Sequence, residues 1–411
     1  MDSSFYGEAA SRRKPMDGVS RTMKSHGARP AALICMTILV TYAVKIGAAT
    51  ELIVGMSAAL SGPASALGQG MKLGIEAYVK QVNDADGLHG HTLRLVALDD
   101  SYQPAPAGLN MQKLIETYKA IAVLGNVGTP TASVTVPIAN EGKILLFGPF
   151  TGAGLLRRSP PDRYVMNYRA SYAEETNAMV DGLLKLGIKP QQIAFFTQSD
   201  AYGDAGYEGA INALKARGYV EAHRLAHGRY KRNTLDVEDG LITILEAKTR
   251  PKAIIMVGAY APCAKFIKLA KKVLPGAIFL NVSFVGSDAL AEALGTAGEG
   301  VIITQVVPHF DADLPGVAAY RQALKAYAPQ AKPGFVSLEG YLVARIFVEG
   351  LKVAGPAPTR ERIIDAIESL TDLDIGIGVN ISYSPTRHQG SHNVWITMIK
   401  EGRVVAIDWV D

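Results

Sequence analysis

Two threonines, Thr129 and Thr151, stand where hydroxyl groups could bind an anion such as a carboxylate. Each follows a short apolar run, residues 121–124 and 144–147, and such runs predict buried strands. Pro130 directly after Thr129 predicts a helix start with the threonine as N-cap, and a helix start offers free N–H donors and a positive dipole end. These residues alone leave open the alternative that the two threonines are only structural, as a helix cap and a turn residue.

The elements around the threonines form a strand–helix–strand unit, with the helix predicted over residues 129–140. A unit this short predicts parallel strands joined by a right-handed crossover. Both strands then deliver their carboxyl ends to one edge of the sheet, where open α/β sheets bind ligands. We therefore expect Thr129 and Thr151 to lie at the same edge.

Further polar and aromatic residues follow strands of a second series: Asp200, Tyr202, Tyr260 and Asp288. Taken singly, each favours a structural role. Together they would place aromatic rings and a carboxylate opposite the threonines, if the two sheet edges face each other.

The rest of the chain alternates strands and helices in two series, separated by a proline-rich break at residues 157–163. This rhythm predicts two doubly wound α/β domains, each with its own sheet. The Gly/Ser-rich stretch 57–70 favours a loop, and residues 219–227 favour a strand. Predicted helices include 71–82, 107–118, 172–186, 204–217, 315–327 and 338–354; predicted strands include 51–56, 92–98, 193–198, 253–257 and a final pair in 394–411.

The net charge of +4 belongs to the first 49 residues, which hold seven Lys/Arg and three acids. Removing these from the totals of 42 and 38 leaves 35 residues of each sign. A chain that is formally neutral after residue 49 offers no positive charge to attract the phosphate backbone of a nucleic acid, so we expect no nucleic-acid partner.

The leader has basic residues, an apolar run over 31–44 and small residues before Thr50, a pattern typical of a secretory signal. Met23 begins a signal of more usual length, which leaves the true start codon open; an uncleaved anchor is the alternative. Cys35 lies in this leader, so Cys263 stands alone in the mature chain and cannot form an internal disulfide.

Signatures of catalysis and metal binding are weak. The sequence has no Gly-x-Gly-x-x-Gly after a strand, no P-loop and no Gly-x-Ser-x-Gly elbow. Histidines spaced by four, His223/His227 and His388/His392, are better explained as loop or surface residues than as zinc ligands. We expect no cofactor, no metal and no enzymatic activity; an enzyme using Asp99 or Asp200 is the alternative from another class.

Several motifs occur in order along residues 51–411: GMS with LSGP, NDADGLHG, LDD, residues 125–131, AYGD and VGAY. As a set they resemble periplasmic substrate-binding proteins of ABC importers, of the leucine/isoleucine/valine-binding type. The resemblance implies a type I periplasmic-binding-protein fold, with two Rossmann-like lobes joined by a three-crossover hinge and closing like a Venus flytrap. The implied division is a leader at 1–49, lobe 1 at 50–167 and 308–393, and lobe 2 at 168–307 and 394–411.

The same resemblance implies roles for individual residues. Thr129 matches a serine that binds the ligand carboxylate, and Thr151, with Gly152 beside it, matches a threonine that contacts both ends of an α-amino acid. Tyr260 and Asp288 match residues that receive the ammonium group, and Tyr202 matches an aromatic that lines the cleft. The family's disulfide cannot form, because Tyr102 and Gly128 occupy its positions. Leu67 replaces a family tyrosine, and Phe147 and Phe150 crowd the Thr151 loop, which indicates a more apolar pocket or another ligand.

The sequence thus predicts a periplasmic, monomeric solute receptor that binds a small amphiphilic ligand and delivers it to an ABC permease in the inner membrane. Branched-chain or similar amino acids are the first candidates. The alternatives are a carboxylate or apolar ligand without an amino group, and a sensor that docks on a signalling partner instead of a permease.

Overall fold

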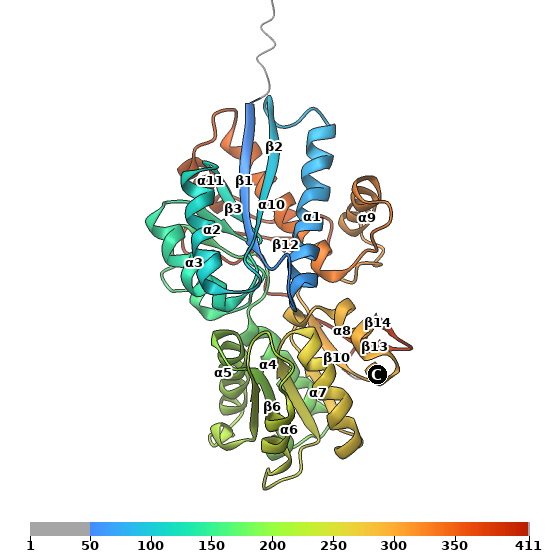
Figure 1. Cartoon of the computed structure of the whole chain (residues 1–411). Helices are drawn as coiled ribbons and strands as arrows, with labels where there is room; N and C mark the ends of the chain where they lie inside the picture. Colours follow the sequence, from blue (N-terminus) through green and yellow to red (C-terminus); the bar gives the residue numbers. More distant parts are fainter. Residues whose placement is uncertain (1–49, 410–411) are drawn as a thin grey trace, which may run out of the picture. The chain divides into compact units, whose positions relative to one another are not determined.

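The structure is a computed structural model that describes residues 50–409. The predicted leader at 1–49 lies outside the described residues. Strands and helices alternate through most of the chain, and the strands form a five-stranded sheet, a seven-stranded sheet and a small two-stranded sheet (Figure 1). We call the elements packed with the five-stranded sheet lobe 1 and those packed with the seven-stranded sheet lobe 2.

Lobe 1 contains a parallel sheet in the order β2-β1-β3-β4-β5. Its strands are β1 (Thr50–Ala58), β2 (His91–Asp99), β3 (Ala122–Leu124), β4 (Leu145–Phe147) and β5 (Val165–Met166). Its early helices are α1 (Ser65–Asp84), α2 (Pro104–Glu116) and α3 (Thr129–Glu141). The order reverses at β1, which pairs with β2 on one side and β3 on the other, and ligands of doubly wound sheets bind at such a switch point.

Helices cover both faces of this sheet, because successive residues of β3 belong to two different hydrophobic cores. Ala122 and Leu124 belong to the large core that includes α1, whereas Val123 belongs to a second core with α2 and α3. Successive strand residues point to opposite faces, so a sheet with helices on both sides reads as a continuous apolar run.

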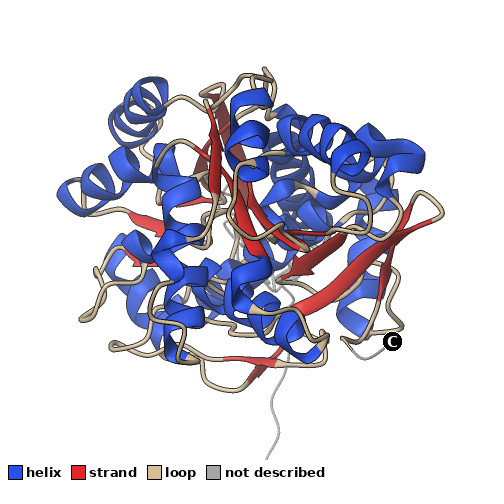
Figure 2. Ribbon diagram, turned by 90° about the horizontal axis from the view of Figure 1, so that it is seen from below, coloured by secondary structure: helices blue, strands red, loops and turns tan. Residues whose placement is uncertain are grey.

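Lobe 2 contains a sheet in the order β7-β6-β8-β9-β10-β13-β14, antiparallel only at β13 and β14. Its strands are β6 (Ile193–Gln198), β7 (His227–Tyr230), β8 (Ala253–Val257), β9 (Ile278–Asn281), β10 (Ile302–Gln305), β13 (Trp395–Lys400) and β14 (Arg403–Ala406). Its helices are α4 (Tyr172–Lys185), α5 (Ala201–Ala216), α6 (Glu238–Leu245), α7 (Tyr260–Val273) and α8 (Ser287–Leu294). Helices pack on both sides of the strands (Figure 2).

Between β10 and β13 the chain returns to lobe 1. It forms α9 (Pro315–Tyr327), α10 (Phe335–Ala354), α11 (Arg360–Glu368), β11 (Leu373–Asp374) and β12 (Asn380–Ile381). Helix α10 packs along α1, and both α9 and α11 pack on this pair. The chain therefore passes between the lobes three times, after β5, after β10 and before β13.

Two of these passages run side by side. Asn167 donates its backbone N–H to His388 O over 2.7 Å, and Gly390 N–H returns a bond to Asn167 O over 2.9 Å. The predicted α/β class with two doubly wound lobes is confirmed. The lobe limits at 167, 307 and 393 stay a prediction.

Two local predictions are wrong. Residues 65–70 are helical and not loop, because Gly68 lets α1 approach the backbone of Ala59, where a Cβ would overlap Ala59 O. The strand expected at 219–227 instead starts at His227, where Gly228 allows close contact with Gly240 of α6.

Candidate ligand-binding site

The structure brings Thr129 and Thr151 together. Thr129 is the first residue of α3 after β3, and Thr151 follows β4, the neighbouring strand. Their hydroxyl oxygens lie 2.7 Å apart, and neither residue is exposed to solvent. The sequence predicts Thr129 as the N-cap of α3, and this prediction is wrong. The N-cap residue is Gly128, and the Thr129 hydroxyl pairs with Thr151.

Gly128 adopts a backbone conformation that is open mainly to glycine, with φ of 103° and ψ of 153°. A Cβ at this position would overlap the Tyr102 ring, so both the backbone angle and the packing require glycine. Tyr102 itself is held by Asp100, whose Oδ1 accepts the Tyr102 N–H over 2.9 Å. This contact forms an Asx-type turn.

Gly152 connects the Thr151 loop to lobe 2. Its carbonyl accepts the N–H of Tyr172, the first residue of α4, over 2.8 Å. A Cβ on Gly152 would lie 2.7 Å from Tyr172 Cδ1. The N-terminal end of α4 thus lies directly against the threonine loop of the other lobe.

A chain of aromatic rings surrounds this junction. The Phe150 ring centroid lies 5.2 Å from that of Phe284, Phe284 lies 4.5 Å from Tyr202, and Tyr202 lies 5.4 Å from Tyr172. Phe284 lies between β9 and α8. It is not among the site residues predicted from the sequence. We name this set of four rings, at residues 150, 172, 202 and 284, the aromatic cluster. All four side chains are buried.

The remaining predicted residues lie towards a separate cavity of about 860 Å³ between the lobes. Leu67 and Asp288 line it, and Leu67 and Tyr260 both lie next to Gly286. Asp288 is exposed on the cavity side, and its Oδ2 accepts the Phe335 N–H at the start of α10 over 3.3 Å. Among the described residues, the hydrogen-bond partner of Asp288 is therefore a helix end of lobe 1 and not a threonine.

A buried ionic network beside the aromatic cluster was missed by the sequence reasoning. Arg169 Nε lies 3.0 Å from Glu339 Oε1 of α10, and Arg169 Nη2 donates to Ser283 Oγ of lobe 2 over 2.6 Å. The Arg169 guanidinium also lies 4.4 Å from the Phe150 ring centroid. Glu175 of α4 completes the network, accepting Ser283 N–H over 2.7 Å.

Burial controls the titration of this network. It raises the pKa of Glu339 to about 7, with the neighbouring Glu175 adding to the rise and Arg169 opposing it. The pKa of Glu175 is also raised by burial, against the Arg169 cation. The network cannot be predicted from a short sequence motif, because Arg169 and Glu339 lie far apart in the sequence and neither belongs to a recognisable motif.

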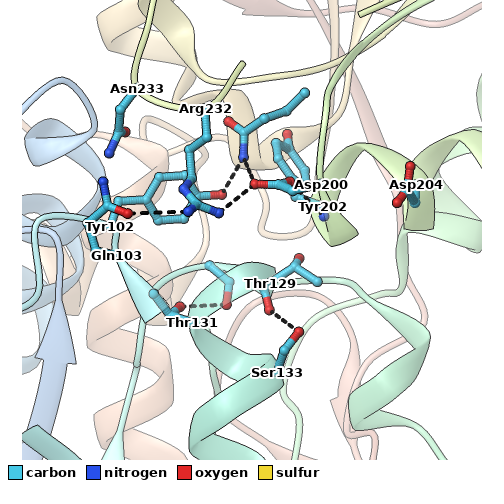
Figure 3. Close-up of polar contacts among 12 residues, drawn as sticks. Tyr102, Gln103, Thr129, Thr131, Ser133, Asp200, Tyr202, Asp204, Arg232 and Asn233 are labelled. Carbon is cyan, nitrogen blue, oxygen red and sulfur yellow. Dashed lines mark hydrogen bonds and ion pairs between the residues drawn. The ribbon is translucent and has the colours of Figure 1, made fainter. Parts of the chain in front are cut away.

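Polar contacts also join the lobes at the mouth of the site (Figure 3). Arg232, after β7, forms an ion pair with Asp200 at 2.8 Å and donates from Nη2 to Gln103 Oε1 of lobe 1 over 3.2 Å. Asn233 donates from Nδ2 to Ser101 O over 3.3 Å. The bonds to Gln103 and Ser101 cross from lobe 2 to lobe 1, whereas the Arg232–Asp200 pair lies within lobe 2.

The described residues contain no group of three or more His, Cys, Asp or Glu placed to hold a metal ion. His388 and His392 lie in a loop; His388 is buried and hydrogen-bonded to backbone carbonyls, whereas His392 is exposed. Cys263 is buried, and burial raises the pKa of its thiol. Of the helices in residues 50–409, none is long and apolar enough to cross a membrane.

Comparison with known proteins matches residues 51–403 to the family described as periplasmic binding protein. A curated relative, Leu/Ile/Val-binding protein homolog 3 of Brucella melitensis, is 23% identical over 380 residues, covering 90% of this chain and 98% of the relative. The crystal structure of a possible leucine/isoleucine/valine-binding protein from Rhodopirellula baltica SH 1 is 47% identical, with a TM-score of 0.86 and coverage of 89% and 98%. A branched chain amino acid ABC transporter structure from Thermus thermophilus with bound valine has the same fold at 21% identity, with a TM-score of 0.78 and coverage of 88% and 96%.

Proposed function

The chain belongs to the periplasmic binding protein family, and we propose that it is the receptor that captures a small amphiphilic solute in the periplasm and delivers it to an ABC permease. Members of this family bind solutes and are not enzymes, in agreement with the expectation from the sequence. The proposal includes the predicted export leader, the monomeric state and the lobe limits.

The observation that carries the proposal is the pairing of the Thr129 and Thr151 hydroxyls at the switch-point edge of lobe 1, covered by Tyr172 and Tyr202 of lobe 2. A hydroxyl pair enclosed by rings of both lobes offers a polar end and an apolar wall to one ligand. We propose ligand contacts at the residues predicted from the sequence: Thr129, Thr151, Gly152, Tyr202, Phe150, Tyr260, Asp288 and Leu67.

Branched-chain or similar amino acids are the first candidates, in line with the names of the relatives in Brucella and Rhodopirellula. A second candidate is a carboxylate or apolar ligand without an amino group. It is favoured by one observation: the Asp288 carboxylate, proposed to receive an ammonium, already accepts the Phe335 N–H.

The test is a thermal-shift screen of residues 50–411 against amino acids, simple carboxylates and apolar metabolites. A ligand at 100 times its dissociation constant adds about 2.7 kcal/mol to the free energy of unfolding, which raises the melting temperature. Thr129→Val should weaken the shift, because it keeps the side-chain shape and removes the hydroxyl.

Thr135→Val is the matched control, because Thr135 is another buried threonine of α3, and its hydroxyl has no partner among the described residues. The proposal fails if no small solute shifts the melting temperature. The site assignment fails if the two variants bind the ligand equally well.

A further inference from the structure

Arg169 stands at the passage from lobe 1 to lobe 2 and is the largest fully buried side chain of the described residues, at 1% exposure. Its Nε faces Glu339, and its Nη2 donates to Ser283 Oγ and Glu339 Oε2. Its third nitrogen, Nη1, has no hydrogen-bond partner among the described residues. A buried guanidinium N–H without an acceptor is uncommon in folded proteins, so this donor calls for an explanation.

A second unpaired donor lies close by. The Tyr172 hydroxyl is buried and has no hydrogen-bond partner among the described residues. The Tyr172 N–H bonds to Gly152 O over 2.8 Å, so α4 begins next to Thr151. Burial raises the pKa of Tyr172 to about 12, and the Arg169 cation and the Thr151 hydroxyl oppose the rise. Two buried donors, one of them cationic, thus adjoin the threonine pair.

The carboxylates of the same region are already occupied. Glu175 accepts the N–H and the hydroxyl of Ser283 and the hydroxyl of Thr304, and these bonds use both of its oxygens. Both Glu339 oxygens face Arg169. Glu339 Oε1 has this ion-pair contact but no hydrogen bond among the described residues. The two donors that lack a partner among residues 50–409, Arg169 Nη1 and the Tyr172 hydroxyl, suit an anion, because N–H and O–H groups donate to a carboxylate oxygen.

The walls around these donors are aromatic. The Phe150 ring stacks on the Arg169 guanidinium, and Phe150, Phe284, Tyr202 and Tyr172 follow one another as the aromatic cluster. Because these groups come from both lobes and the passage between them, separation of the lobes opens the donors and the rings together. A ligand with one anionic end and an apolar body fits this combination.

We propose that Arg169 Nη1 and Tyr172 Oη bind the carboxylate of a small apolar or aromatic acid, and that this site does not require an amino group on the ligand. The proposal rests on the proposed function and names its ligand class. It adds Arg169 and Tyr172 to the ligand contacts and makes them the residues that select a carboxylate over its neutral analogue.

The test is an isothermal titration of the purified protein with three probes of one carbon skeleton: leucine, 4-methylpentanoate and 4-methylpentanamide. Phenylacetate and phenylacetamide form a second pair with an aromatic body. We expect each carboxylate to bind at least about tenfold more tightly than its amide, the ratio that a charge-assisted hydrogen bond supports. We expect the loss of the amino group not to weaken binding.

Tyr172→Phe is the decisive variant, because it removes only a hydroxyl that has no partner in the ligand-free protein. It should weaken carboxylate binding about tenfold and amide binding less, because a hydrogen bond to a charged acceptor is stronger than one to a neutral carbonyl. Tyr168→Phe is the matched control, since the Tyr168 hydroxyl is equally buried and has no hydrogen-bond partner among the described residues. Burial raises the pKa of Tyr168, with Glu339 and Tyr383 adding to the rise and Arg169 opposing it. Arg169→Lys keeps the charge opposite Glu339 and should reduce the preference for carboxylate over amide.

The outcomes separate the two proposals. Binding of leucine without binding of the des-amino acids overturns the proposal that the site does not require an amino group, and it leaves the proposed receptor function intact. Binding of the acids with equal effects of Tyr172→Phe and Tyr168→Phe overturns the residue assignment. If none of the probes binds, the proposed ligand class is wrong.

Discussion

Arg169 and Glu339 form an ion pair, with Nε and Oε1 3.0 Å apart, in which both side chains are at most 2% exposed. Arg169 belongs to the passage between the lobes and Glu339 to α10 of lobe 1, while Ser283 of lobe 2 binds the same guanidinium. A fully buried pair offers little net stability but is costly to break on one side. It therefore ties the passage between the lobes to the proposed ligand site.

The pH dependence of the free energy of unfolding should reflect the protonation of the Glu339 carboxyl group. Its pKa is about 7 in the folded protein because of burial and the charge of Glu175, with Arg169 and Arg157 opposing the rise, against 4.5 ordinarily. Between these values the folded state holds a proton that the unfolded state has released, so stability falls as pH rises through this window. Glu339→Gln should flatten that part of the profile in urea unfolding at pH 5, 6 and 7.

The control for this experiment is Glu349→Gln on the same helix, where Glu349 pairs with Lys352 at the surface. That variant should keep the pH dependence of the wild type. An unchanged profile in Glu339→Gln would show that Glu339 does not hold the proton.

Arg232 should slow ligand release, because its bond to Gln103 joins the two lobes. Arg232→Gln should raise the ligand dissociation rate several-fold and leave the association rate nearly unchanged, since most affinity differences between related complexes lie in the dissociation rate. Arg229→Gln is the matched control, since the partners of Arg229 among residues 50–409, Asp204 and Gln198 O, both belong to lobe 2. Stopped-flow displacement measures both rates, and equal dissociation rates in the two variants would contradict the bridging role.

Gly128→Ala should destabilise the protein more than a change in backbone angle explains. Gly128 and Gly218 both have positive φ, at 103° and 88°, but only Gly128 is packed against the Tyr102 ring. Gly218→Ala should cost about 1 kcal/mol from the left-handed conformation alone. Gly128→Ala should cost about 2 kcal/mol more, because overpacking adds to the strain. Urea denaturation measures both, and similar losses would mean that the Tyr102 ring moves aside freely.

Much of the fold could be predicted where strands are buried on both faces. The runs Ile193–Gln198 and Ala253–Val257 match the predicted strands residue for residue, because polar residues bound each apolar run. Helix α8 was missed, since its eight residues are too few to show a helical period. The sequence predicts a loop at the start of α1, because glycines that serve close packing, Gly68 and Gly70, look the same in sequence as glycines that serve turns.

The site could be predicted where the topology alone brings residues together. Thr129 and Thr151 follow neighbouring parallel strands, so their meeting at one edge follows from strand order. The Arg169–Glu339 pair depends instead on how α10 returns to lobe 1 late in the chain, and nothing local encodes that return. Asp288 illustrates the same limit, because its partner Phe335 begins that returning helix.

The most direct test of the account is a crystal structure of the protein with the compound that gives the largest shift in the thermal screen. We predict that the polar end of this compound lies within hydrogen-bond distance of the Thr129 and Thr151 hydroxyls, with its apolar body against the aromatic cluster. A ligand found instead in the cavity lined by Leu67 and Asp288, with the threonine pair still closed, would contradict the proposed site.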